Sequence, residues 1–402
     1  MIPTLLADGE PHTYAVNTSY KIDQVRVQMK KKKRTTDAAA NFDPRKVALA
    51  VAAISLLAIP FAFVQEELMG QLSQTWVLVF SLAILLSVGV AGYLLVFRHL
   101  SASVRRDPYL YFFLIFAFAA IADLLISLTL LGYSDLMRSY TKDSEPYLQS
   151  SYGAASLLWD GIVHFLLYVW LCFCIASSTR HFKSGLFWAG SMFGACFVYM
   201  MANLIGEYAE HIEPAYLLNV PFMLVPAFYA WRISKDSGFI QGVESPPASL
   251  RTHALAFALL TAAVISAYRM LVVLAPQIST TVFWGEQIEP YLLSPSRYPQ
   301  IQMIAYGMYV APFAILAIIS LWRPPSAGIA IWSWIMAGFV AQGQFAHMFA
   351  TVISESTVTS QHPFFWIANL IVLVVPLWFA YHYSGRLSAV GAGAELERRS
   401  AT

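Results

Sequence analysis

The stretch SLLWDGIVHFLLYVWLCFCIAS, residues 156–177, holds an acid and an imidazole among apolar side chains. Asp160 and His164 are four residues apart, so on a helix they lie one turn apart on the same face. In a low dielectric, burial favours the neutral form of the acid, whereas a protonated imidazole favours the charged form. The pair is therefore suited to passing a proton, and a purely structural hydrogen bond is the equally weighted alternative.

The composition indicates what surrounds this pair. Of the 402 residues, 58% are hydrophobic and only 12% are charged, and the mean hydropathy is +0.59. Soluble domains carry about 25% charged residues, and a membrane-spanning helix needs about 20 apolar residues. The chain is therefore expected to be an all-α polytopic membrane protein.

We expect about ten transmembrane helices, because apolar segments without β-barrel alternation recur along the chain. They lie at 47–64, 76–98, 109–133, 152–177, 185–206, 215–233, 252–275, 301–322, 329–352 and 363–384.

The charges of the connecting loops predict the topology. If residues 1–46 are a basic cytosolic tail, with the run KKKKR at 30–34, nine Lys and Arg residues fall in cytosolic loops and three in the opposite loops. The opposite loops are rich in acids, as the positive-inside rule requires of the non-cytosolic side. Both termini, including a tail at 385–402, are therefore expected in the cytosol.

Two short motifs indicate an internal repeat. EPYL occurs at 145–148 and at 289–292, and an asparagine precedes a proline by seven positions at Asn219 and again at Asn369. The offsets of 144 and 150 predict two tandem, parallel four-helix units. We assign them to 99–235 and 252–384, after two extra helices at 47–98 and separated by a cytosolic linker at 236–251.

The polar residues within spans share one depth. In the first repeat Asp123, Asp160, His164, Asn203 and Asn219 fall in the predicted luminal half. In the second repeat this half holds Arg269, Gln302, Gln342, Gln344, His347 and Asn369. Charged groups in a span cost about 2.5–3.5 kcal/mol each on insertion scales and usually face an interior. We therefore expect one polar-lined pocket in each repeat.

Several of these groups have structural alternatives. The amides can make helix–helix hydrogen bonds worth under about 1 kcal/mol on average. Arg269 can extend to the luminal surface, and His347 can be a satisfied interior histidine.

Other kinds of site are not indicated. The three cysteines, Cys172, Cys174 and Cys196, lie in apolar segments without zinc-ligand spacing. The sequence has no phosphate loop, and its net charge of +2 does not indicate a nucleic-acid partner. No cofactor and no metal is expected.

Five blocks resemble, in order, the signatures of the transmembrane 6 superfamily: YTKDSEPYL followed by WDGIVHFLLY, ANLIGEY, FMLVP, IEPYLLSPSRYPQIQM and AQGQFAHM. The resemblance runs from about residue 47 to 384. It implies two EXPERA domains, four-helix units shared with the emopamil-binding sterol isomerase and the sigma-2 receptor.

The resemblance also implies site residues and a location. The isomerase's intramembrane acid corresponds to Asp160 and its asparagine to Asn219, while Phe222 replaces its tryptophan; its histidine and glutamate on the first helix have no clear match around Asp123. Family members are linked to the endoplasmic reticulum, neutral-lipid storage and lipidation of secreted lipoproteins. The expected location is thus the endoplasmic reticulum membrane, the ER–Golgi intermediate compartment or the lysosome.

Three functions follow. The first is a protein that binds a sterol or another membrane lipid and regulates lipid metabolism, either alone or as a homo-oligomer. Its candidate lipid contacts are Trp159, Asn203, Asn219, Phe222, Arg269, Gln302, Gln344, His347 and Asn369. The second is a sterol double-bond isomerase with Asp160 as acid, His164 as shuttle and Asp123 as base or cation partner. The third is a proton-coupled lipid transporter.

Overall fold

The computed structural model describes residues 43–69, 71–179, 181–235, 249–354 and 362–400, with side chains described up to residue 386. The basic run at 30–34, nearly all of the N-terminal tail and most of the linker at 236–251 lie outside these residues.

The described part of the chain is all-α, as expected, and it contains nine helices or helix pairs that are long and apolar enough to cross a membrane. They run over Pro44–Leu68, Gln74–His99, Pro108–Leu130, Ser151–Ala176, Phe182–Ile205, Leu250–Leu274, Tyr298–Leu321, Ala327–Ile353 and Pro363–Arg386. The predicted span at 215–233 is shorter than these. It is a 3-10 segment, η5 (Pro214–Asn219), followed by α11 (Val220–Lys235).

The first four-helix bundle consists of α6 (Pro108–Leu130), the pair α8 (Ser151–Trp159) and α9 (Phe165–Ala176), α10 (Phe182–Ile205) and α11. The second consists of α12 (Leu250–Leu274), the pair α14 (Tyr298–Ala305) and α15 (Ala311–Leu321), α16 (Ala327–Ile353) and α18 (Pro363–Ser400). α18 extends beyond its candidate membrane span, Pro363–Arg386, and continues through Ser400.

The second helix of each bundle is interrupted at the same place. A π-helical turn, η3 (Asp160–His164), joins α8 to α9, and η8 (Tyr306–Val310) joins α14 to α15. Such single π-turns inside α-helices are frequent at functional sites. The first of them contains both residues of the Asp160–His164 pair.

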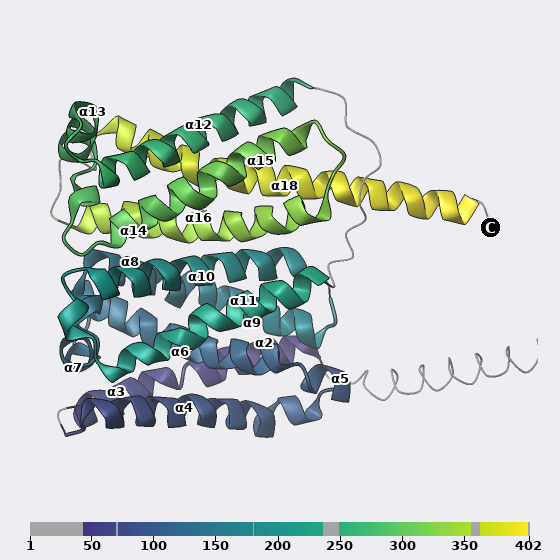
Figure 1. The fold of residues 1–402 in the computed structure, drawn as a ribbon. Helices are drawn as coiled ribbons and strands as arrows, with labels where there is room; N and C mark the ends of the chain where they lie inside the picture. Colours follow the sequence, from purple (N-terminus) through teal and green to yellow (C-terminus); the bar gives the residue numbers. More distant parts are fainter. Residues whose placement is uncertain (1–42, 70, 180, 236–248, 355–361, 401–402) are drawn as a thin grey trace, which may run out of the picture.

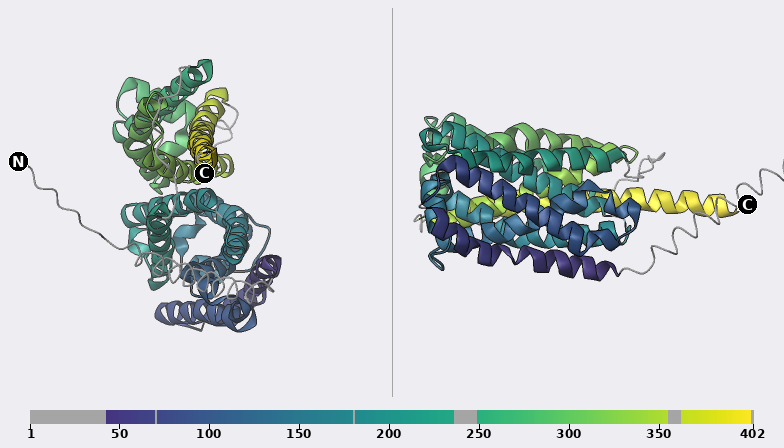
Figure 2. Two further views of the ribbon diagram at one scale, coloured as in Figure 1. Left: turned by 90° about the vertical axis from the view of Figure 1, so that its right-hand side faces the viewer. Right: turned by 90° about the horizontal axis from the view of Figure 1, so that it is seen from below.

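The two bundles lie side by side and meet along α10 and α16 (Figures 1 and 2). Glycines allow this close contact: a Cβ on Gly190 would lie 1.9 Å from the Ile335 carbonyl oxygen, and one on Gly338 would lie 1.8 Å from the Phe187 carbonyl oxygen. Small residues serve the same purpose at other helix contacts in membranes.

Three helices cover the first bundle on the side away from the second (Figures 1 and 2). α2 (Pro44–Ser55) packs on α6 and α9, α3 (Ala58–Met69) on α6 and α7 (Arg138–Asp143), and α4 (Gln74–Leu95) on α6 and η5. α2 and α3 together form the first predicted span and α4 forms the second.

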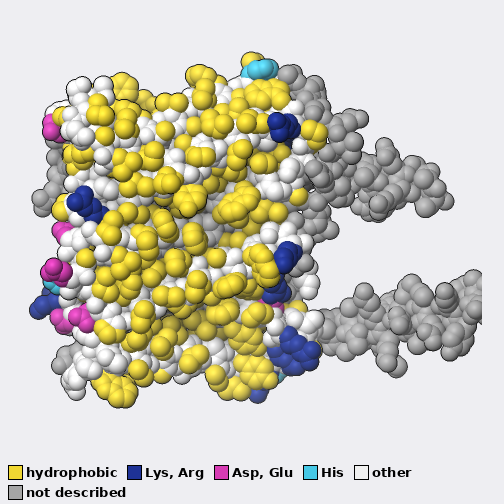
Figure 3. Space-filling view, in the orientation of Figure 1, with side chains coloured by type: hydrophobic (Ala, Val, Ile, Leu, Met, Phe, Trp, Pro, Cys, Tyr) yellow, Lys and Arg dark blue, Asp and Glu magenta, His cyan; other side chains and the backbone are white. Residues whose placement is uncertain are grey.

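The charges gather at opposite ends of an apolar band (Figure 3). We call the end that carries α7 and α13 (Ser279–Phe283) the acidic end, and the other the basic end (Figure 1). α2 begins and α18 ends at the basic end, where Arg98, Arg105 and Arg232 also lie.

Candidate functional site

The first bundle contains a cavity of about 160 Å³ that is partly open. An engineered apolar cavity of about 150 Å³ binds benzene, so this space admits a ring or a segment of a lipid. Four predicted site residues line it: Asp123, Asp160, Asn219 and Phe222. The other lining residues are mostly apolar and come from α3, α4, α6, α8, α10 and η5.

Asp123 and Asp160 both line this cavity, from α6 and η3. The Asp160 Oδ1 lies against His164, and its Oδ2 is buried and makes no hydrogen bond within the described residues. Gly161 lets η3 approach α6 closely: a Cβ at this position would lie 2.5 Å from the Leu124 Cβ. Two carboxyl groups in one site are a known arrangement for acid–base chemistry.

His164 lies behind Asp160 and completes a chain of hydrogen bonds. Its Nδ1 is 2.6 Å from the Asp160 Oδ1, and its Nε2 is 2.6 Å from the Ser191 Oγ. The Trp159 indole N–H lies 3.0 Å from the same Ser191 oxygen. With an N–H on Nδ1 donated to Asp160, Nε2 accepts from the serine.

Asp160, His164 and Ser191 are connected in the order of a catalytic triad, yet Ser191 is not placed to attack a substrate. It is fully buried against the α10–α16 contact, where a Cβ on Gly338 would lie 2.9 Å from its backbone nitrogen. Neither Ser191 nor His164 lines the cavity. This chain of hydrogen bonds therefore orients Asp160. Trp159 is part of it and does not line the cavity.

Glu145 is a cavity residue that the sequence-based prediction missed. It receives hydrogen bonds of 2.8 Å from Tyr140 and from Tyr147, and one of 3.1 Å from the Asn219 amide. Burial raises the pKa of Glu145 to about 7, although these three hydrogen bonds act in the opposite direction. The EPYL repeat is the sequence signal for this glutamate, although it lies in a predicted loop between spans.

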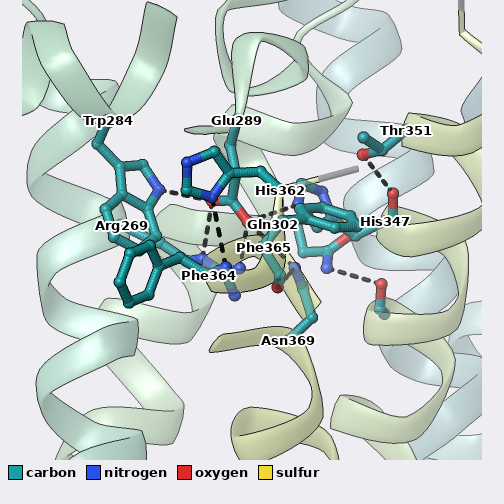
Figure 4. A network of polar contacts seen from close by, with 11 residues as sticks. Arg269, Trp284, Glu289, Gln302, His347, Thr351, His362, Phe364, Phe365 and Asn369 are labelled. Atoms are coloured by element: carbon teal, nitrogen blue, oxygen red, sulfur yellow. Dashed lines mark hydrogen bonds and ion pairs between the residues drawn. The ribbon is translucent and has the colours of Figure 1, made fainter. Parts of the chain in front are cut away.

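Glu289, from the second EPYL, lies among the polar side chains of the second bundle (Figure 4). It is fully buried and accepts a 3.1 Å hydrogen bond from the Asn369 amide, as Glu145 does from Asn219. The Trp284 indole N–H donates a further bond of 2.8 Å. The two asparagines thus fix the loop glutamates of the two repeats in the same way.

Arg269 distinguishes the surroundings of Glu289 in the second bundle from those of Glu145 in the first. Its Nε lies 2.9 Å from the Glu289 Oε2, and its Nη2 is paired with the other carboxylate oxygen. Burial alone would raise the pKa of Glu289, but the Arg269 guanidinium, with His347 and Trp284, holds it at about 2. Arg269 is fully buried, so it does not extend to the membrane surface.

The remaining predicted residues of the second bundle surround this ion pair. The His347 Nε2 is 3.7 Å from Glu289, and the Gln302 amide donates to the Gly343 carbonyl at 2.8 Å. Gln344 is fully buried beside them on α16. These side chains are buried around the ion pair, although both amide atoms of Gln344 make no hydrogen bond within the described residues, and none of them lines the cavity of the first bundle.

Asn203 and Phe222 have different roles. Asn203 accepts a hydrogen bond from the Tyr298 hydroxyl of the second bundle and does not line the cavity. Phe222 stacks on Phe116 with ring centroids 4.3 Å apart and contributes an apolar wall. Asn203 therefore joins the two bundles, whereas Phe222 belongs to the cavity.

Within the described residues no group of three or more His, Cys, Asp or Glu side chains is arranged to hold a metal ion. Cys172, Cys174 and Cys196 are free and buried.

The chain matches known proteins over most of its length. The family description "Transmembrane 6 superfamily member 2-like, transmembrane domain" matches residues 57–243. Human Transmembrane 6 superfamily member 2 is 33% identical over 82% of this chain and 91% of its own length. The mouse protein of the same name is 31% identical over 82% of this chain and 90% of its own length. No solved structure matches the chain significantly. The agreement with these relatives over nearly their full length shows that the chain belongs to the transmembrane 6 superfamily.

Proposed function

We propose that this protein binds a sterol or another membrane lipid in the cavity of the first bundle and thereby regulates lipid metabolism. The observation that carries the proposal is an apolar cavity inside a membrane-spanning bundle that also contains three carboxyl side chains, Asp123, Glu145 and Asp160. Ligand sites typically combine apolar walls with a few convergent polar groups.

The polar lining supports a particular kind of head group. The carboxyl oxygens of Asp123, Glu145 and Asp160 accept hydrogen bonds, and the cavity lining includes no Lys, Arg or His. A sterol hydroxyl or a positively charged head group would complement these acceptors. The apolar body of the ligand would contact walls such as Phe118 and Phe222.

We place the protein in the endoplasmic reticulum membrane with both termini in the cytosol, where it would support neutral-lipid storage and lipoprotein lipidation. The charge distribution supports this orientation, since basic side chains gather where α2 begins and α18 ends. The proposed role follows the resemblance to the family.

Binding of a photoreactive sterol by the purified full-length protein in nanodiscs tests the proposal. Asp160→Asn and Asp123→Asn should each weaken saturable labelling by about ten-fold, because a hydrogen bond to a charged group contributes about 1.5–3 kcal/mol. Asp135→Asn, at an exposed acid outside the cavity, is the matched control. Absence of saturable labelling, together with an unchanged lipid composition in cells lacking the protein, would contradict the proposal.

A second candidate function is sterol double-bond isomerisation. The presence of Asp123 and Asp160 in one cavity favours it, because moving an alkene needs one group to deliver a proton and another to remove one. His164 would orient Asp160 during both steps. Rescue of an isomerase-deficient yeast strain by the wild type but not by Asp160→Asn would support it, and equal rescue by both would exclude this mechanism.

A further inference from the structure

Helices α3 and α4 form one wall of the cavity. Phe61 and Gln65 of α3, with Ser81, Ile84 and Leu85 of α4, belong to its lining. These helices precede the four-helix bundle in sequence and pack on its outer side (Figure 2). A lipid that reaches the cavity from the bilayer on this side must pass them.

The wall is anchored at the basic end. Val47 and Val51 of α2 are buried against the bundle, and Phe97, directly after α4, is fully buried. Gly92 lets the end of α4 lie against α6, since a Cβ there would be 2.1 Å from the Leu114 Cδ2. Apolar packing of α2 and of the last turn of α4 thus holds the α2–α4 segment against the bundle at the basic end.

At the acidic end, side-chain hydrogen bonds supplement the contacts of this wall with the bundle. The Glu66 carboxylate accepts from the Ser139 backbone N–H at 2.9 Å and from its hydroxyl at 2.7 Å. The Ser144 hydroxyl donates to the Gln74 side chain at 2.8 Å. Both serines lie in or next to α7, beside the loop that carries Glu145.

The segment also contains a break at which it can bend. α2 ends at Ser55 and α3 begins at Ala58, and Pro60 has no N–H to continue the helical hydrogen bonds. Proline positions are where sharp helix kinks concentrate. The break separates α2, which is anchored through Val47 and Val51, from the cavity-lining α3.

We propose that α3 and α4 are a lateral gate, through which a bilayer lipid enters the cavity when the Glu66–Ser139 and Gln74–Ser144 contacts open. The gate pivots on the packed basic end and on the α2–α3 break. The gate rests on the proposed function, because the molecule that passes through it is the lipid bound beside Asp123 and Asp160.

Reversible cross-linking tests the gate. Glu66→Cys with Ser139→Cys, joined by a short bis-methanethiosulfonate, should slow uptake and release of the photoreactive sterol by more than about ten-fold, and reduction should restore both rates. Asp107→Cys with Arg232→Cys is the matched control, because this 3.0 Å ion pair joins α6 to α11 without involving α3 or α4. Equal rates with and without the Glu66–Ser139 cross-link would overturn the gate.

Loosening the contact gives the opposite expectation. Glu66→Ala should speed release by about ten-fold, whereas Glu67→Ala, at its exposed neighbour, should leave it unchanged. Spin labels at Trp76 and Ile205, both exposed at the acidic end, should show a wider distance distribution in Glu66→Ala than in the wild type. Labels at Leu95 and Trp231, near the basic end, should not change.

The spin-label distances separate failure of the gate from failure of the proposed function. Saturable sterol binding with an unchanged acidic-end distance in Glu66→Ala would overturn the gate alone. A widened distance in a protein that binds no lipid would overturn the proposed function and, with it, the assignment of a lipid guest to the gate.

Discussion

At the residue scale, two glutamates from equivalent loops have opposite electrostatic surroundings. Glu145 is held by two tyrosines and Asn219, without a buried cation, whereas Glu289 is held by Arg269 as well as by Asn369. Burial raises the pKa of the first to about 7, and the Arg269 charge overcomes burial to hold the second at about 2. One repeat thus retains an acidic cavity where the other has an internal ion pair.

The ion pair makes Glu289 essential for stability. Glu289→Gln leaves the Arg269 charge buried and unpaired, which typically costs about 3–5 kcal/mol. We expect a large drop in the melting temperature in detergent, whereas Asp135→Asn should have little effect. Adding Arg269→Met to Glu289→Gln should recover much of the loss, and a double variant no more stable than the single one would contradict this account.

Glu145 should make stability depend on pH. Its folded pKa of about 7 exceeds the ordinary value of 4.5, so folding favours the protonated form. The contribution of Glu145 to the free energy of unfolding is therefore greatest below about pH 4.5. It falls by about 3 kcal/mol as the pH rises to about 7. Melting temperatures at pH 5 and pH 8 should differ more in the wild type than in Glu145→Gln, and equal differences would contradict the assignment.

At the element scale, the π-turn η3 positions the candidate chemistry. It places Asp160 in the lining of the cavity that Asp123 also lines, and His164 against Ser191, and Gly161 lets the turn contact α6. The same interruption recurs at η8 in the second bundle, where Tyr306 occupies its first position. The turn is therefore a shared feature of the two repeats, while the acid is particular to the first.

Gly161→Ala should disrupt this turn. Its Cβ would lie 2.5 Å from Leu124, so η3 must move away from α6, at a typical cost of about 1–3 kcal/mol. Sterol binding should weaken because Asp160 is displaced from its place in the cavity lining. Gly89→Ala on α4, where a Cβ meets its nearest atom at 3.4 Å, is the control and should bind normally. Wild-type binding by Gly161→Ala would remove the role assigned to the turn.

At the scale of the whole molecule, two bundles are joined through glycine contacts of α10 and α16 and through the hydrogen bond between Tyr298 and Asn203. The same Tyr298 hydroxyl lies 3.1 Å from the carbonyl oxygen of Tyr147, two residues after Glu145. The second bundle thus supports the loop that closes the cavity of the first. Its own polar centre is filled by Arg269 and acts as a structural partner.

The contact between the bundles should be sensitive to side-chain volume. Gly338→Leu overpacks the α10–α16 contact and should cost about 1–3 kcal/mol or more. Gly328→Leu near the start of the same helix is the control, since a Cβ there meets only the Ser326 hydroxyl at 3.7 Å. Melting temperatures of both variants in detergent provide the measurement, and equal stability would contradict the close contact.

The sequence predicted the all-α membrane class, and its repeated EPYL and Asn–Pro motifs pointed to pairs of residues that the structure brings together in each bundle. It could not show that Glu145 and Glu289 are buried, because both lie in polar loops that fold back into the bundles only through short 3-10 turns. The π-turns were also beyond prediction, since an apolar helix with or without an extra residue in one turn has the same pattern. Arg269 lies near a predicted span end, and nothing in the sequence pairs it with Glu289, which is 20 residues away in the following loop.

The most direct test of the central claim is the position at which a bound photoreactive sterol attaches to the protein. Mass spectrometry of the labelled wild type should find competable adducts on cavity-lining residues such as Ser156, Leu157 and Phe222. These adducts should decrease in Asp160→Asn. Adducts confined to outward-facing residues such as Leu166 and Trp170, with the same yield in Asp160→Asn, would contradict a lipid site in the first bundle.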